Sequence, residues 1–142
     1  MEPLKKPFSL EFQVRDYELD QYGVVNNAAY LNYLEHARHE FLVTLGIDPA
    51  EVARQGRSLA LAGIDVRFQS PLRSRERFVV QVTLSKLTGA RAVFHQKISR
   101  LPAATPVLEA WAEAVFLNQA GGPQRIAPAH REAFLPYLED PQ

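Results

Sequence analysis

The sequence predicts an α+β fold in which a curled antiparallel sheet wraps around one long central helix. Three observations lead to this fold: an alternating segment at residues 8–15, an uninterrupted apolar segment at residues 28–45, and four later segments typical of strands. Short turns join the later segments, and short turns connect antiparallel strands but not parallel ones. A sheet with one apolar face needs a cover, and the long helix is the large apolar element available.

The first two elements follow from the spacing of their apolar residues. Residues 8–15 alternate between apolar and polar side chains, which is typical of a half-buried strand. Residues 28–45 contain neither Gly nor Pro, and apolar side chains recur there at the period of a helix. Gly46 ends this helix, as glycine does just past many helix ends. Asp48 and Pro49 then predict the N-cap and first turn of a short second helix.

The rest of the chain is predicted to form strands and one terminal helix. The strands span residues 59–69, 77–86, 92–101 and 107–117, with Pro or Gly in the turns between them. Residues 128–135 predict the helix. Edge strands stay open unless another chain covers them. We therefore expect a dimer that pairs two sheets edge to edge, or a tetramer of such dimers.

Length and composition narrow the class of protein. The 142 residues fit one domain, with a core over about residues 8–118 and a C-terminal extension over residues 119–142. Sixteen basic and sixteen acidic residues balance, and no basic run points to nucleic acid. The absence of cysteine excludes disulfides, thiolate metal sites and cysteine nucleophiles. We expect no signal peptide and no membrane span, and a location in the cytoplasm or a plastid stroma.

The loop between the first strand and the long helix carries the most informative residue, Asp20. A carboxylate on a glycine-containing loop can serve as a base or a nucleophile, and the free N–H groups of a helix start can hold a developing oxyanion. The simpler interpretation is that Asp20, Asn26 and Asn27 only shape a turn and cap the helix. The local chemistry leaves both interpretations open.

The same loop resembles the hotdog-fold thioesterases of the 4-hydroxybenzoyl-CoA thioesterase type. Their pattern is an Asp, a Gly three residues later, two apolar residues, a polar or aromatic pair and a Tyr on the helix. The matching residues here are Asp20, Gly23, Val24, Val25, Asn26, Asn27 and Tyr30. The turn at residues 68–74 is also similar to the corresponding turn in these proteins. The resemblance covers about residues 8–118. The run at residues 15–27 is more similar still to plant acyl-lipid (acyl-ACP) thioesterases and their relatives in photosynthetic organisms.

The resemblance implies an enzyme that hydrolyses acyl thioesters, preferably fatty acyl or 3-oxoacyl groups on acyl carrier protein (ACP). It implies that Asp20 is the catalytic carboxylate, that the main-chain N–H of Asn27 polarises the thioester carbonyl, and that Gly23 lets the loop turn tightly. Many relatives carry an aromatic residue or histidine where this chain has Asn27. A main-chain role does not depend on that side chain. Whether Asp20 attacks the carbonyl or deprotonates water stays open.

Six further residues are candidates for substrate contacts. Tyr30, Tyr33, Leu59 and Leu61 are placed to line an acyl site, although each is also a simple core residue. Arg73 and Arg75 belong to a short basic cluster that suits a carrier phosphate. The expected partner is therefore an acyl-ACP or acyl-CoA thioester.

Other functions are weighed against this one. The first alternative is an acyl-CoA thioesterase acting on aromatic or aliphatic acyl groups. A hotdog dehydratase would need a histidine beside its carboxylate, and residues 16–27 contain none. A non-catalytic acyl-binding module has no need for Asp20. His36 and His39 have a spacing that suits a metal pair, but no third ligand converges on them, so neither a metal nor a cofactor is expected.

Overall fold

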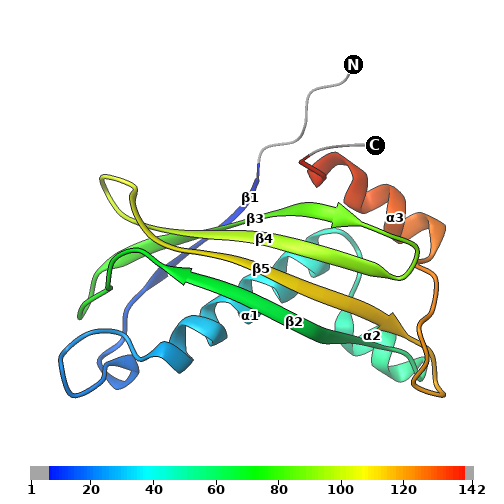
Figure 1. Ribbon diagram of the computed structural model, residues 1–142, viewed down its shortest axis with the longest axis horizontal. Helices are drawn as coiled ribbons and strands as arrows, with labels where there is room; N and C mark the ends of the chain where they lie inside the picture. The colour runs from blue at the N-terminus through cyan, green and yellow to red at the C-terminus, as the bar shows by residue number, and fades with distance from the viewer. Residues whose placement is uncertain (1–6, 140–142) are drawn as a thin grey trace.

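A long helix lies against one face of a five-stranded antiparallel sheet in the computed structural model, which describes residues 7–139 (Figure 1). The strands in their order across the sheet are β1 (Phe8–Gln13), β3 (Arg77–Leu87), β4 (Arg91–Arg100), β5 (Thr105–Leu117) and β2 (Ser58–Phe68). The helices are α1 (Asn27–Thr44), α2 (Pro49–Arg54) and α3 (Pro128–Phe134), with short 3₁₀ segments η1 (Asp16–Glu18) and η2 (Leu135–Tyr137). The predicted α+β hotdog architecture is confirmed, with small shifts at the ends of the elements.

The core forms between α1 and the inner face of the sheet. The predicted strand at residues 77–86 is β3, and its alternate, inward-facing residues are fully buried: Phe78, Val80, Val82 and Leu84. Leu34, Ala37 and Phe41 of α1 are equally buried against the sheet. Burying each large apolar side chain contributes roughly 1.5–3 kcal/mol. This contact therefore sets the position of α1 along the sheet.

Local signals at the ends of the helices act as the sequence predicts. The Asn26 side chain caps α1 by accepting a hydrogen bond from the N–H of Ala28 at 2.9 Å. Gly46 has a φ of +79°, a left-handed conformation that glycine adopts without strain. Asp48 caps α2 by accepting a hydrogen bond from the N–H of Ala50 at 3.0 Å.

Strand β2 differs from its neighbours because it is an edge strand and is largely exposed. Its pairing with β5 shifts register between Leu61 and Gly63, which marks a bulge. The apolar residues Leu61, Ile64 and Phe68 are 49%, 36% and 55% exposed. The apolar pattern of this segment therefore does not correspond to burial within one chain.

The C-terminal segment is part of the core rather than an appendage. Phe134 is fully buried, and its ring lies 6.4 Å from those of Phe94 and Phe116. On the outer face of the sheet, the two ring nitrogens of His95 lie 2.7 Å from a Glu139 oxygen and 2.5 Å from a Glu109 oxygen. Residues 119–139 are thus held to the sheet by both apolar and polar contacts.

Replacing Phe134 with Ala should destabilise the whole domain. The substitution leaves a cavity between β4, β5 and α3, and such changes cost about 3–5 kcal/mol. The free energy of unfolding from urea titration measures the effect. Leu135→Ala is the control, because Leu135 is 45% exposed and should lose much less. A loss for Phe134→Ala as small as the one expected for Leu135→Ala would contradict the prediction.

Candidate active site

The loop between η1 and α1 is a small hairpin. Leu19 and Val25 form an antiparallel bridge, and the N–H of Asp20 donates to the Val24 carbonyl at 2.8 Å. Gly23 has a φ of +76°, and its N–H donates to the Asp20 carbonyl at 3.1 Å, which closes the turn. The tight turn expected at Gly23 is therefore present. The hairpin holds Asp20 and the start of α1 on one short segment.

The Asp20 carboxylate is half-buried and partly anchored. Its Oδ1 accepts hydrogen bonds from the N–H groups of Tyr22 at 2.8 Å and Val24 at 3.4 Å. These bonds are typical of an Asx turn, so the turn-shaping role of Asp20 is real. Among the described residues nothing bonds to Oδ2. One carboxylate oxygen is therefore fixed by the backbone while the other stays open to a substrate or a water.

The first turn of α1 leaves one backbone donor free. The N–H of Ala28 bonds to the Asn26 side chain, and the N–H of Ala29 bonds to the Asn26 carbonyl. The N–H of Asn27 has no acceptor within residues 7–139. A helix start carries partial positive charge, so this free donor is suited to an oxygen that gains negative charge.

The turn before β3 lies directly against the hairpin. Val24 forms an isolated bridge with Arg73, and the N–H of Val25 donates to the Leu72 carbonyl at 2.9 Å. The Tyr30 hydroxyl accepts a hydrogen bond from the N–H of Leu72 at 3.0 Å, and burial raises the pKa of Tyr30. Tyr30 thus holds this turn to α1. Arg73 and Arg75 are both exposed beside the loop.

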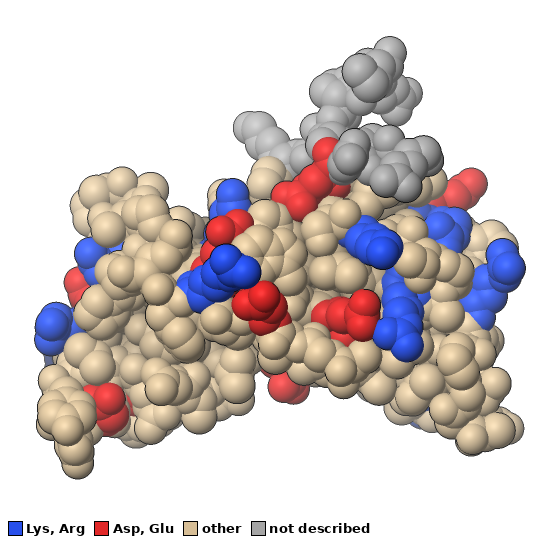
Figure 2. Space-filling model, viewed as in Figure 1, with Lys and Arg blue, Asp and Glu red and all other residues tan. Residues whose placement is uncertain are grey.

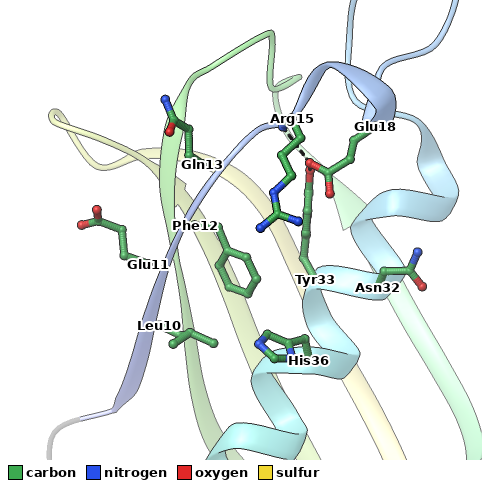
Figure 3. Close-up of a pocket in the computed structure, with 9 residues that line it drawn as sticks. All are labelled: Leu10, Glu11, Phe12, Gln13, Arg15, Glu18, Asn32, Tyr33 and His36. Carbon is green, nitrogen blue, oxygen red and sulfur yellow. Dashed lines mark hydrogen bonds between the residues drawn. The ribbon is translucent and has the colours of Figure 1, made fainter.

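A cavity of about 540 Å³ lies on one flank of α1, between the helix and β1 (Figure 3). Tyr33 lines it, and the Tyr33 hydroxyl donates to Glu18 Oε1 at 2.7 Å. The same oxygen accepts a hydrogen bond from the N–H of Arg15 at 2.8 Å. Arg15 and His36 also extend toward this cavity. Glu18 therefore ties η1 to α1, a role that the sequence did not reveal.

A second cavity, of about 230 Å³, lies on the other flank of α1; we call it the α1/β2 cavity. Its lining residues are Glu35, Arg38, His39, Leu42, Leu59, Ala60, Leu61, Phe94 and Ala114. The sequence predicted Leu59 and Leu61 as acyl contacts but not Arg38. The available signal was a charged residue within the wide apolar arc of the helix.

The predicted site residues thus occupy different places. Tyr33 lines one cavity and Leu59 and Leu61 the other, while Asp20 and Tyr30 line neither. His36 and His39 face opposite flanks of α1, and no group of three potential ligands that could hold a metal occurs within residues 7–139. Across the same residues, no helix has the length and apolar character needed to span a bilayer.

The fold and this site define a thioesterase of the hotdog type. Residues 14–134 match the model of the thioesterase-like superfamily, and the chain belongs to that family. The protein is accordingly a thioester hydrolase that acts on acyl thioesters.

Two plant proteins and one solved structure are similar to this chain. The chloroplastic acyl-acyl carrier protein thioesterase ATL3 of Arabidopsis thaliana is 48% identical over 129 residues, which are 91% of this chain and 68% of that protein. The corresponding ATL2 is 45% identical over 130 residues, 92% of this chain and 69% of that protein. The structure of Slr0204, a 1,4-dihydroxy-2-naphthoyl-CoA thioesterase from Synechocystis, superposes with a TM-score of 0.85. That superposition covers 89% of this chain and 94% of the other at 20% identity.

Replacing Tyr33 with Phe should reduce the loss of stability at alkaline pH. Burial, aided by the hydrogen bond to Glu18, raises the pKa of Tyr33. The folded chain therefore keeps a proton that the unfolded chain releases above about pH 10, so stability falls as pH rises beyond that value. The variant should lose about 1–2 kcal/mol at neutral pH but fall less steeply above pH 10.

Urea titrations between about pH 8 and pH 11 measure both effects. Tyr17→Phe is the control, because Tyr17 is 76% exposed and its substitution removes no buried hydroxyl. An unchanged slope in the Tyr33 variant would contradict the prediction.

Proposed function

We propose that this protein hydrolyses fatty acyl or 3-oxoacyl thioesters of acyl carrier protein, with Asp20 and the main-chain N–H of Asn27 as the catalytic groups. One observation carries the proposal. A carboxylate with one anchored and one open oxygen lies on the same hairpin as a helix-start N–H that has no acceptor in the described chain.

In the proposed mechanism the thioester carbonyl oxygen lies against the N–H of Asn27. The open oxygen of Asp20 either attacks the carbonyl carbon, giving an anhydride that water then hydrolyses, or takes a proton from a water that attacks. In both routes the C–S bond breaks and the carrier leaves as a thiolate, which takes up a proton derived from the water that is consumed, so the products are the free acid and the carrier thiol. Negative charge develops on the carbonyl oxygen, so a fixed donor at a helix start lowers the barrier.

The choice of carrier is part of the proposal. Both plant relatives are named as acyl-ACP thioesterases, which supports ACP over CoA as the carrier. Arg73 and Arg75 are exposed next to the catalytic hairpin, where they can meet a phosphate or an acidic carrier surface. Elsewhere, acidic and basic side chains are interspersed on the face shown in Figure 2. The expected location is the cytoplasm or a plastid stroma.

We further propose that the working form contains at least two copies, as a dimer or a tetramer of dimers. Strand β2 is an edge of the sheet, and it exposes Leu61, Ile64 and Phe68. Pairing with a second copy would satisfy the free edge and cover these side chains. Asp20 lines neither flanking cavity of the single chain, so a second copy would also complete the walls of the site.

Replacing Asp20 with Asn should lower turnover by several orders of magnitude. The amide is neither a base nor a useful nucleophile, although its oxygen can still accept the two hydrogen bonds that shape the turn. Release of free thiol from a panel of acyl-ACP and acyl-CoA thioesters measures the effect.

Asp16→Asn is the matched control. It removes the same charge from the same loop, at an exposed side chain that accepts a hydrogen bond from Ser74. We expect it to retain most of the activity. A fully active Asp20→Asn variant would refute the catalytic role of Asp20, and an inert wild type would favour the binding module.

Reversing the charge of both Arg73 and Arg75 to Glu should discriminate between the carriers. Repulsion of an acidic carrier slows encounter, so KM for acyl-ACP should rise about tenfold at low salt and less at high salt. KM for the matching acyl-CoA should change less if the carrier protein itself is recognised. Arg125→Glu, at an exposed position near the C-terminal helix, is the control. Equal changes for the two substrates would contradict carrier docking at this turn.

A further inference from the structure

Arg38 is a half-buried cation that forms no ion pair within residues 7–139, although the charge of Glu35 acts on it and opposes the lowering of its pKa. Its Nη1 donates to Gln96 Oε1 at 3.0 Å, and that is its one hydrogen bond to residues 7–139. No ion pair joins Arg38 to Glu35, which lies one turn earlier on α1 and is exposed. Burial lowers the pKa of the guanidinium, yet arginine stays charged at neutral pH. The remaining N–H donors have no acceptor within residues 7–139 and keep access to solvent, so they can bind an anion that enters the cavity.

Gln96 holds Arg38 in this position. Gln96 is fully buried, and its Nε2 donates to the Leu34 carbonyl at 2.9 Å. The amide oxygen is thereby aimed at Arg38. A fully buried amide that is satisfied at both ends has little freedom to move. The guanidinium is fixed at one nitrogen and has its other edge free.

The α1/β2 cavity, which Arg38 lines, has a polar side and an apolar side. Leu42, Leu59, Leu61, Phe94 and Ala114 form the apolar side. Glu35 and His39 are the other polar residues that line it, and both are exposed on α1. A fixed cation beside an apolar wall matches a ligand with a charged head and an aliphatic tail.

We propose that the α1/β2 cavity binds an aliphatic carboxylate, with its head group on Arg38 and its alkyl chain along Leu59, Leu61 and Phe94. The planar guanidinium presents two parallel donors, which suit the two oxygens of a carboxylate better than a single carbonyl or hydroxyl oxygen. The volume of about 230 Å³ is below the usual range for drug-sized ligands. It therefore fits a short or medium chain.

Such a carboxylate has two sources, given the thioesterase activity. One is the free acid released by hydrolysis, which would then act as a product inhibitor. The other is the far end of an acyl group that itself ends in a carboxylate, which would then be selected as a substrate. Both use the same contact with Arg38. The second source rests on the proposed function, whereas binding of the free acid does not.

Calorimetric titration of the full-length protein with octanoate tests the site directly. We expect saturable binding at one site per chain, and much weaker binding of octanol, which has the same tail without the charge. Arg38→Met keeps an unbranched apolar stem and removes the donors. It should weaken octanoate binding about tenfold or more and leave octanol unchanged. Arg38→Lys keeps the charge but not the paired donors, so its affinity for octanoate should lie between those of wild type and Arg38→Met.

Two further variants keep the test decisive. His39→Glu places an anion beside the cavity at an exposed position of α1, so it should repel octanoate even though Arg38 is intact. Arg54→Met, at an exposed arginine of α2, should have no effect. The proposal is overturned if octanoate does not bind saturably, if it binds no better than octanol, or if Arg38→Met binds it as tightly as wild type.

Kinetics then distinguish the two sources. If octanoate inhibits the wild type and this inhibition disappears in Arg38→Met, the ligand of the cavity is the free acid released by hydrolysis. The second measurement is kcat/KM for a suberyl thioester, which ends in a carboxylate, divided by kcat/KM for the octanoyl thioester. A ratio that falls about tenfold from wild type to Arg38→Met supports binding of the carboxylate at the far end of the acyl group. Octanoate binding through Arg38 in a protein that hydrolyses none of the thioesters would uphold the site and refute the proposed function. A change in the mass of the assembly in Arg38→Met would instead assign Arg38 to a contact between copies and overturn the proposal.

Discussion

The packing of α1 against the inner face of β3 and β4 is the contact on which the rest of the molecule depends. The Tyr33 and Phe78 rings lie 4.7 Å apart, and those of Phe41 and Phe94 lie 6.2 Å apart. Protein interiors are close-packed, so a helix held by such contacts cannot slide along the sheet. The same packing determines where α1 begins, and therefore where its free N–H points. It also determines the two flanks on which the cavities form.

Two tyrosines extend that constraint from the core to the loops. Tyr30 accepts a hydrogen bond from the backbone of the turn before β3, and Tyr33 donates to Glu18 in η1. Both rings are buried on α1, so each hydroxyl is a fixed point for an otherwise exposed segment. The hairpin that carries Asp20 lies between these two attachments. Its position thus follows from the core, although the tip of its turn is exposed.

The structural and chemical interpretations of Asp20 prove to be compatible. The bonds from the Tyr22 and Val24 N–H groups shape the turn, and they also orient the carboxylate with one oxygen left open. A site residue held by its own backbone needs no other side chain to position it. This arrangement suits a thioester, because its good leaving group makes less demand on the catalytic residues than an amide does.

The sequence by itself determined the elements and the chemistry of the loop. Alternation in β3, the helical period of α1, and the caps at Asn26 and Asp48 all act over a few residues, so their outcome can be read locally. The Asp20 turn and its Gly23 are local in the same sense. Gln96 alternates with apolar residues on one face of β4, but its bonds to Leu34 and Arg38 join segments far apart in the sequence and cannot be read locally.

The tertiary structure alone decided which residues share a cavity and which stay exposed. Strand β2 is rich in apolar residues, but the order of the strands puts it at an edge of the sheet. A bulge near Leu61 also alters which of its side chains face inward. Tyr33 and Leu59 lie on opposite flanks of α1, and His95 meets Glu139 from the far end of the chain. Contacts between segments distant in sequence depend on strand order and register, and no short pattern of residues encodes either one.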